Sequence, residues 1–190
     1  MFHKINLPLK DSDVAKLKIG DRVLLSGIIV TARDYLHKLL TKKKPKIDLK
    51  GGLIYHCGPI TLKTGDEYRV LAAGPTTSIR EEPYEDEIIS TYKVKAIMGK
   101  GGMGEKTLKS LKKNKAVYLQ TIGGAAQVLA AKIKRVVDVK YLHLSETEAM
   151  WFFEVEDFPA VVTMDCYGNS LYDKIRNDSQ KKLNKLNDGE

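Results

Sequence analysis

The chain of 190 residues is 43% hydrophobic and 29% charged, with a net charge of +8, a composition that excludes a disordered or fibrous protein. This length predicts a single domain over residues 1–190, because two full domains would leave each with a small core. The sequence has no apolar run of 18 residues and no export signal at its start, so we expect a cytoplasmic protein without a membrane partner.

The first third of the chain predicts extended structure and one short helix. Residues 18–32 contain a glycine turn followed by β-branched residues, which indicates paired strands. Leucines recur at helical spacing in residues 34–44, and Pro45 is expected to end that helix. Residues 53–58 are mostly apolar and lie between glycines, as in a buried strand.

From residue 68 onward the chain alternates strand, glycine turn and helix. The pattern appears in residues 68–82, 94–114 and 116–136. Pro83 fits the first position of the helix that follows the first of these turns, where no backbone hydrogen bond is lost. This alternation is typical of βαβ units, so we predict an α/β fold with a mostly parallel sheet whose ligand lies beyond the carboxyl ends of the strands.

The remainder of the chain predicts two strands and a polar helix. Residues 151–168 read as two strands around Pro159, and a helix is expected from Ser170 onward. Residues 173–190 have little apolar content, so we predict a polar C-terminal helix or tail with frayed last residues.

The positive charge raises the question of nucleic-acid binding, because a basic face is the footprint of phosphate contacts. The basic clusters at 38–50 and 100–115 are separated by acidic stretches at 81–87 and 146–157. The basic runs contain no aromatic pattern of the RNA-recognition type and no helix-turn-helix signature. We therefore predict no nucleic-acid partner and expect some of the charge to serve a small anionic substrate.

Residues 99–107, GKGGMGEKT, come close to a variant of the nucleotide phosphate loop. Glu105 displaces the lysine at 106 by one position and puts a carboxylate where phosphate charge would gather. A P-loop-like nucleotide binder or a nucleic-acid-binding domain is therefore a distant alternative.

Three glycine junctions predict an anion site at one edge of the sheet. Residues 74–78 offer hydroxyls and amides with Arg80 close behind, residues 99–102 offer Lys100, and residues 121–124 offer open amides. Helix starts and arginine side chains both bind carboxylates well. Arg33 joins this site if the first strand ends at the same edge.

Other polar residues receive structural interpretations. His37 is expected on the surface of its helix, and Asp165 is expected to stabilise a turn. His56 and Cys57 lie in an apolar strand, which favours the core over a ligand role. Cys57 and Cys166 are the only cysteines, so a four-cysteine iron-sulfur site cannot be built from this chain alone.

Six ordered motifs, TARDYLHK, GPTTSIR, MGKGGM, TIGGAA, VEDFPA and DCYGNSLY, resemble the β subunit of the class I iron-sulfur fumarate hydratase and L-tartrate dehydratase family. In longer relatives the same region is the C-terminal domain. The resemblance implies a swivelling β/β/α domain of three layers, with a mostly parallel sheet bearing helices and a second, smaller β layer. It also implies that the domain closes over a partner that carries a 4Fe-4S cluster.

The resemblance further implies roles for four residues. Arg33, Arg80 and Lys100 would bind the carboxylates of a C4 dicarboxylate, and Thr76 would be the base at the substrate carbon. The cluster would belong to an α subunit in a heteromer, expected as a dimer of heterodimers. This chain alone would bind no metal or cofactor.

The implied activity is a hydro-lyase that needs its α subunit and interconverts fumarate and (S)-malate. The dehydration of tartrate to oxaloacetate is the nearest alternative, because these cations would hold either dicarboxylate. Removing water across a carbon-carbon bond needs a base and cations that stabilise the developing aci-carboxylate. Threonine is a poor base in water, so Thr76 depends on a closed site that lowers its pKa.

Overall fold

The computed structural model describes residues 2–187. Its dominant feature is a seven-stranded sheet that closes on itself, because the second strand of the chain also pairs with the last strand of the chain. The strands are, in the order in which they pair, β1 (Phe2–Asn6), β2 (Arg22–Thr31), β3 (Leu53–Tyr55), β6 (Ala96–Gly99), β7 (Val117–Gln120), β9 (Met150–Met164) and β8 (Ile133–Lys140).

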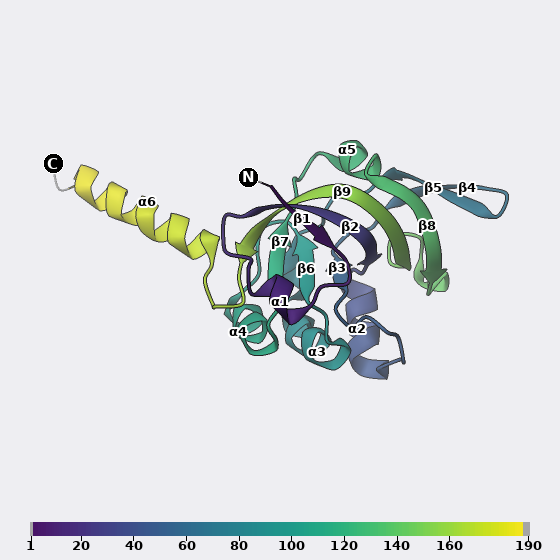
Figure 1. The fold of residues 1–190 in the computed structure, drawn as a ribbon, viewed down its shortest axis with the longest axis horizontal. Coiled ribbons are helices and arrows are strands. Elements are labelled where there is room, and N and C mark those ends of the chain that lie inside the picture. The colour runs from purple at the N-terminus through teal and green to yellow at the C-terminus, as the bar shows by residue number, and fades with distance from the viewer. Residues whose placement is uncertain (1, 188–190) are drawn as a thin grey trace.

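The pairing of β2 with β9 closes the sheet into a barrel-like shape, which Figure 1 shows as two long strands arching over the shorter ones. Strands β1, β2, β3, β6 and β7 are parallel to one another. Strand β9 runs antiparallel to β2, β7 and β8. The predicted α/β class with a mostly parallel sheet is therefore confirmed.

A second, smaller sheet consists of β4 (Ile60–Thr64) and β5 (Glu67–Ala72), which pair as an antiparallel hairpin. A second, smaller antiparallel sheet is thus present beside the mostly parallel one. The prediction that residues 68–72 start a strand of the parallel sheet was wrong, because this segment turns back at Gly65 and pairs with β4 instead. Alternate residues of β5 are exposed, as expected for a hairpin that protrudes from the body (Figure 1).

The strand at residues 150–164 corrects a second prediction. β9 is a single strand of fifteen residues and not two strands around Pro159. Pro159 lies opposite Leu24 within the ladder, while Gly27 and Asp157 adopt positive φ angles near the register shift. These bulge positions bend the ladder without interrupting it, so one strand can span the curved sheet.

The α-helices between residues 34 and 114 cover one face of this sheet, while the short helix at residues 126–130 lies on the other side, beside β5 (Figure 1). The regular helices are α1 (Asp11–Val14), α2 (Asp34–Lys43), α3 (Glu82–Tyr92), α4 (Glu105–Asn114), α5 (Ala126–Ala130) and α6 (Leu171–Asn187), and the short 3-10 helices are η1 (Ser78–Glu81) and η2 (Leu142–Leu144). Helix α3 packs between α2 and α4 (Figure 1). Helix α6 corresponds to the polar helix expected near the C-terminus and extends away from the body (Figure 1). Residues 188–190, for which fraying was expected, lie outside the described part.

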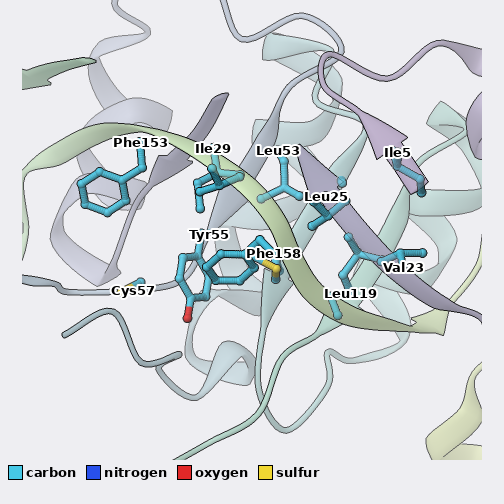
Figure 2. Packing of buried hydrophobic residues seen from close by; sticks show 14 of the residues in the cluster. Ile5, Val23, Leu25, Ile29, Leu53, Tyr55, Cys57, Leu119, Phe153 and Phe158 are labelled. Atoms are coloured by element: carbon cyan, nitrogen blue, oxygen red, sulfur yellow. The ribbon is translucent and has the colours of Figure 1, made fainter. Parts of the chain in front are cut away.

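Two apolar clusters hold the two faces of the sheet. Alternate residues of each strand point inward, so Leu53 and Tyr55 join the inner cluster while Ile54 faces the helices. Figure 2 shows Tyr55 beside Phe158 in the inner cluster, and their rings meet edge to face at 5.6 Å. This packing on both faces gives the strand ends a rigid support.

No helix in residues 2–187 is both long and apolar enough to cross a membrane.

Candidate active site

Four neighbouring parallel strands end at one edge of the sheet, and a polar residue follows each of them. Arg33 comes after β2, His56 directly after β3, Lys100 directly after β6, and Thr121 directly after β7. Because the carboxyl ends of parallel strands meet at the same edge, these residues lie together although the sequence separates them widely.

The segment around Thr76 runs between the ends of β3 and β6. The Thr76 amide donates to the His56 carbonyl at 2.7 Å, and the Lys100 amide donates to the Thr76 carbonyl at 3.3 Å. The Ser78 amide then donates to the Lys100 carbonyl at 2.9 Å. Thr76 and Lys100 are therefore held beside each other by main-chain hydrogen bonds, although β5 does not belong to the main sheet.

The Thr76 side chain has an unusual environment. Its Oγ1 atom is buried and has no hydrogen-bond partner among residues 2–187. A buried hydroxyl without a partner costs free energy comparable to a lost hydrogen bond. The hydroxyl is thus available to a ligand that supplies the missing bond.

Arg33 approaches this segment from the start of α2. Its Nε lies 3.5 Å from Glu148 Oε1, and its side chain crosses Gly58, where a Cβ atom would lie 2.7 Å from Arg33 Nη1. Residues 57 and 75 form a bridge, so this arginine lies near the chain that leads into Thr76. Glycine is favoured at residue 58 because a Cβ atom there would also lie 2.8 Å from the Thr147 carbonyl oxygen, which cannot move aside as a side chain can.

Arg80 lies in η1 and is linked to Arg33 through Asp34. Arg80 Nε is 3.5 Å from Asp34 Oδ1, and both side chains are about half exposed. A hydrogen bond with Glu81 lowers the pKa of Asp34, and the charges of Arg80 and Arg33 lower it further. The two arginines therefore share one carboxylate neighbourhood.

Lys100 extends along the third glycine junction. A Cβ atom at Gly123 would lie 3.4 Å from Lys100 Cδ, so the lysine stem passes over this glycine. Within residues 2–187, Arg33 and Arg80 have carboxylate partners and Lys100 has none. All three predicted glycine junctions thus meet at this edge, with Lys100 as the cation not engaged in an ion pair there.

The interpretation of His37 as a surface residue was wrong. His37 is fully buried because it lies on the same face of α2 as Leu36 and Leu40. Its Nδ1 is 2.9 Å from the Arg33 carbonyl oxygen, and its Nε2 is 2.8 Å from Glu85 Oε1. The spacing of three residues between His37 and Leu40 is the sequence signal that indicates this burial.

His56 joins the same carboxylate from the end of β3. Its Nε2 lies 2.8 Å from Glu85 Oε1 and its Nδ1 lies 2.9 Å from Ser78 Oγ. His56, Glu85 and Ser78 are all fully buried. The expectation that His56 and Cys57 belong to the interior is confirmed, but the polar contacts of His56 and the role of Glu85 were missed.

The protonation states of His37, His56 and Glu85 depend on their contacts with one another. Burial favours the neutral form of His37, but the hydrogen bond and charge of Glu85 outweigh it and raise the pKa to about 9. Burial likewise opposes ionisation of Glu85, yet the hydrogen bonds from both histidines lower its pKa to about 2. Burial lowers the pKa of His56. Glu85 and His37 therefore form a buried ion pair beside a neutral His56.

One group of side chains in residues 2–187 has the composition of a metal site. Ligand atoms of His37, His56 and Glu85 lie within 4.8 Å of one another. Two imidazoles and a carboxylate would suit an ion such as zinc. However, the separations of 2.8 Å between Glu85 and each histidine are those of hydrogen bonds, which already satisfy these atoms.

The cysteines do not fit an iron-sulfur cluster. Clusters of this kind are held by several thiolates. Both cysteines are free, and Cys57 is buried, which raises the pKa of its thiol. Burial also raises the pKa of Cys166. The described residues 2–187 therefore provide too few ligands for a 4Fe-4S group.

The glycine loop resembles a phosphate loop in sequence but not in its contacts. Helix α4 begins at Glu105, and its first amides are bound by the carboxylate of Glu82 from α3. Glu82 Oε2 accepts from the Gly104 amide at 2.7 Å, and Glu82 Oε1 accepts from the Thr107 amide at 3.0 Å. A protein carboxylate thus occupies the position where a phosphate would bind.

Asp165 has the turn role that the sequence predicts. Its Oδ1 accepts hydrogen bonds from the amides of Tyr167 and Asn169, both at 3.0 Å. Lys106, the apparent phosphate-loop lysine, is exposed and donates to the Pro83 carbonyl at 3.2 Å. Neither side chain joins the site in residues 2–187.

Comparison with known proteins gives consistent results. The family model described as the fumarase C-terminus matches residues 2–175. A candidate class I fumarate hydratase from Geobacillus stearothermophilus is 49% identical over 183 residues, which are 96% of this chain and 36% of that protein. The chain thus spans about a third of that relative.

Two relatives have lengths close to that of this chain. A candidate L(+)-tartrate dehydratase subunit β from Methanocaldococcus jannaschii is 43% identical over 185 residues, with 94% of this chain and 95% of the relative covered. The L(+)-tartrate dehydratase subunit β of Escherichia coli K12 is 37% identical over 170 residues, with 88% and 85% covered.

Proposed function

The chain belongs to the fumarase C-terminus family, and from this premise we propose that it is the β subunit of a hydro-lyase that interconverts fumarate and (S)-malate. The similarity to a candidate class I fumarate hydratase, at 49% identity, supports this reaction. Two similar proteins of comparable length are named as β subunits, which supports a role within a heteromer.

One observation carries the proposal. The Thr76 hydroxyl is buried without a partner among the described residues, and its backbone is hydrogen-bonded to that of Lys100. A base needs a lone pair that no other hydrogen bond occupies, and a nearby cation lowers the cost of deprotonation. A hydroxyl without a partner, on a segment whose backbone is bonded to that of Lys100, supports the assignment of a proton-abstracting site.

The cations divide the work of binding. We assign Arg33, Arg80 and Lys100 to the two carboxylates of the substrate, and Thr76 to the proton on the carbon next to the one that carries the hydroxyl. Arginine can bind a carboxylate with two parallel hydrogen bonds, while lysine acts as a point charge. When the proton leaves, negative charge builds up on the adjacent carboxylate, and a fixed cation stabilises that charge.

The partner supplies what this chain lacks. Because residues 2–187 do not fit a 4Fe-4S group, we propose that an α subunit carries the cluster and that this domain swivels to close over it. The exposed parts of Arg80 and Lys100 at the sheet edge are consistent with a site completed by another surface. Closure would exclude bulk water from the substrate and from the cations that bind it.

The dehydration of L-tartrate to oxaloacetate is a second candidate. Two relatives named as L(+)-tartrate dehydratase β subunits match this chain over most of their own lengths. Both reactions act on a C4 dicarboxylate whose two carboxylates must be bound, so the same cationic residues serve either substrate.

Coexpression with an α subunit tests the function. The complex, reconstituted anaerobically, should act on fumarate and malate, and the chain alone should be inactive. Activity with tartrate alone would select the second candidate. Activity of the isolated chain, or inactivity of the complex on all three substrates, would exclude the proposal.

A further inference from the structure

A series of buried side chains runs beneath the candidate active site and connects its two sides. We call it the buried network, and its members are Tyr118, Ser78, His56, Glu85 and His37. Each of these side chains is fully buried. Four different elements contribute them, namely β7, η1, α3 and α2, together with the residue after β3.

The contacts of the network allow one arrangement of protons. The Arg33 carbonyl can only accept, so Nδ1 of His37 carries a proton, and ionised Glu85 accepts from Nε2 of both histidines. His56 is then left with a bare Nδ1, which accepts from the Ser78 hydroxyl. The Ser78 oxygen in turn accepts from the Tyr118 hydroxyl at 2.8 Å.

Two members of the network touch the backbone of proposed site residues. His37 binds the Arg33 carbonyl through both its amide and its ring, each at 2.9 Å. The Ser78 amide donates to the Lys100 carbonyl at 2.9 Å. The network therefore joins Arg33 on one side of the site to Lys100 on the other.

The middle of the network is fixed to Thr76. The His56 carbonyl accepts from the Thr76 amide at 2.7 Å, while the ring of His56 binds Ser78 and Glu85 on its two sides. Arg80 follows Ser78 by two residues within η1. A shift of the His56 ring would thus move Thr76 and η1 together.

We propose that the buried network is a set of positioning residues that holds Arg33, Thr76 and Lys100 at their working separations. The inference rests on the proposed function, since it concerns the geometry of that site. No member of the network needs to touch the substrate. Its contribution comes from precision, because a displacement of about 1 Å can cost roughly 100-fold in rate.

Substitutions on the two sides of the His56 ring interrupt the network without removing a site residue. Ser78→Ala removes the hydroxyl between Tyr118 and His56, and Glu85→Gln removes the charge that joins the histidines. Ile88→Val is the matched control, because Ile88 is fully buried in the same helix as Glu85 and belongs to the apolar core. The control reports what a loss of stability alone does to activity.

The kinetics of the αβ complex test the positioning role. Each network variant should lower kcat/KM by about 10- to 100-fold, with kcat falling more than KM rises, because the cations remain present to bind carboxylates. The double variant should lose less than the product of the two single losses, as expected for residues in one network. Ile88→Val should stay within about twofold of wild type after correction for folded protein.

Spectra of the isolated chain test the network independently of activity. Nitrogen-15 shifts of the histidine rings at pH 7 should show His37 protonated on both nitrogens and His56 neutral with its proton on Nε2. Glu85→Gln should change the ring signals of both histidines, and Ile88→Val should leave them unchanged. A stoichiometric metal ion that is bound by the purified chain and lost on Glu85→Gln would overturn the proton arrangement.

The outcomes separate this inference from the proposed function. A wild-type complex inactive on fumarate, malate and tartrate overturns the function. An active complex in which Ser78→Ala and Glu85→Gln behave like Ile88→Val overturns the positioning role alone. Losses confined to the network variants, with the expected histidine spectra, support both.

Discussion

The Ser78 hydroxyl occupies the space that a side chain would need at residue 99. A Cβ atom at Gly99 would overlap Ser78 Oγ and would lie 3.2 Å from His56 Cβ. Glycine is thus required at the start of this loop because another segment of the same chain packs against it. The close packing explains a glycine that, in the sequence, suggests a phosphate loop.

Gly99→Ala should lower the free energy of unfolding by about 1–3 kcal/mol, the usual cost of overpacking a filled interior. Urea denaturation of the isolated chain measures this loss. Gly123→Ala is the control, because a Cβ there would make an ordinary contact with Lys100 at 3.4 Å. The cost of Gly99→Ala should shrink in a Ser78→Ala background, and equal costs in both backgrounds would contradict the overlap.

Glu82→Ala should destabilise the protein through the start of α4. The carboxylate of Glu82 binds the amides of Gly104 and Thr107 and also the Thr107 hydroxyl at 2.6 Å. Loss of such a cap typically costs about 0.5–2 kcal/mol. Glu105→Ala, a substitution of an exposed residue in the same helical turn, should cost less in the same urea experiment. Equal losses of stability in the two variants would show that the hydrogen bonds of Glu82 to the start of α4 do not stabilise the protein.

Local patterns in the sequence predict helices α2, α3, α4 and α6 and strands β2, β3, β6 and β7, but they miss α1, β1, β4 and β8. Helix α2 ends at Lys43, before Pro45, and Pro83 lies in the first turn of α3. The glycine junctions meet at one sheet edge because parallel strands bring their ends together. These features follow from spacing over a few residues, so a single sequence contains the information.

Features that depend on distant contacts could not be predicted in this way. The closure of the sheet relies on β2 pairing with β9, more than a hundred residues later. The cap on α4 comes from Glu82 on another helix, and no local motif announces it. His37 and Glu85 become buried partners only when α2 and α3 pack together. The contacts of the buried network therefore could not be predicted from the sequence, because they form only between elements that are distant along the chain.

The two lysines of the glycine loop should behave differently in the αβ complex. Lys100→Gln should lower kcat/KM by roughly 10- to 100-fold, the effect of one lost charge-assisted hydrogen bond. Lys106→Gln should leave it within about twofold, because Lys106 is exposed on α4 and donates to the Pro83 carbonyl, away from the site. Steady-state rates with fumarate decide between them. Tight binding of Mg-ATP that depends on Lys106 would instead revive the nucleotide alternative.

Thr76→Val should abolish most activity while the fold persists. Valine has nearly the shape of threonine but lacks the hydroxyl, and Thr76 Oγ1 has no hydrogen-bond partner among residues 2–187 to lose. The free energy of unfolding should therefore stay the same or rise. Thr77→Val is the neighbouring control, since Thr77 is exposed. If both variants retain the wild-type kcat, Thr76 is not the base.

Buried acids and bases near the site make stability depend on pH. Burial and a hydrogen bond with Asp34 raise the pKa of Glu81 from 4.5 to about 8. Its folded state binds the proton more tightly than the unfolded chain, so this stabilisation is complete below pH 4.5 and is lost as the pH rises toward 8. His37, with a pKa raised from 6.5 to about 9, stabilises below pH 6.5 and loses that contribution as the pH rises through 9.

The two groups act in the same direction, so the free energy of unfolding should fall between pH 6.5 and 9. Urea denaturation of the isolated chain at closely spaced pH values measures the slope. Glu81→Gln removes one of the two titrating groups, and its stability should decline less steeply between pH 6.5 and 8. Glu85 acts at the acid end: its pKa is lowered from 4.5 to about 2, so its contribution is complete above pH 4.5 and is lost as the pH falls toward 2. A wild-type stability that is flat from pH 6.5 to 9, or identical slopes for wild type and Glu81→Gln, would contradict the assigned protonation states.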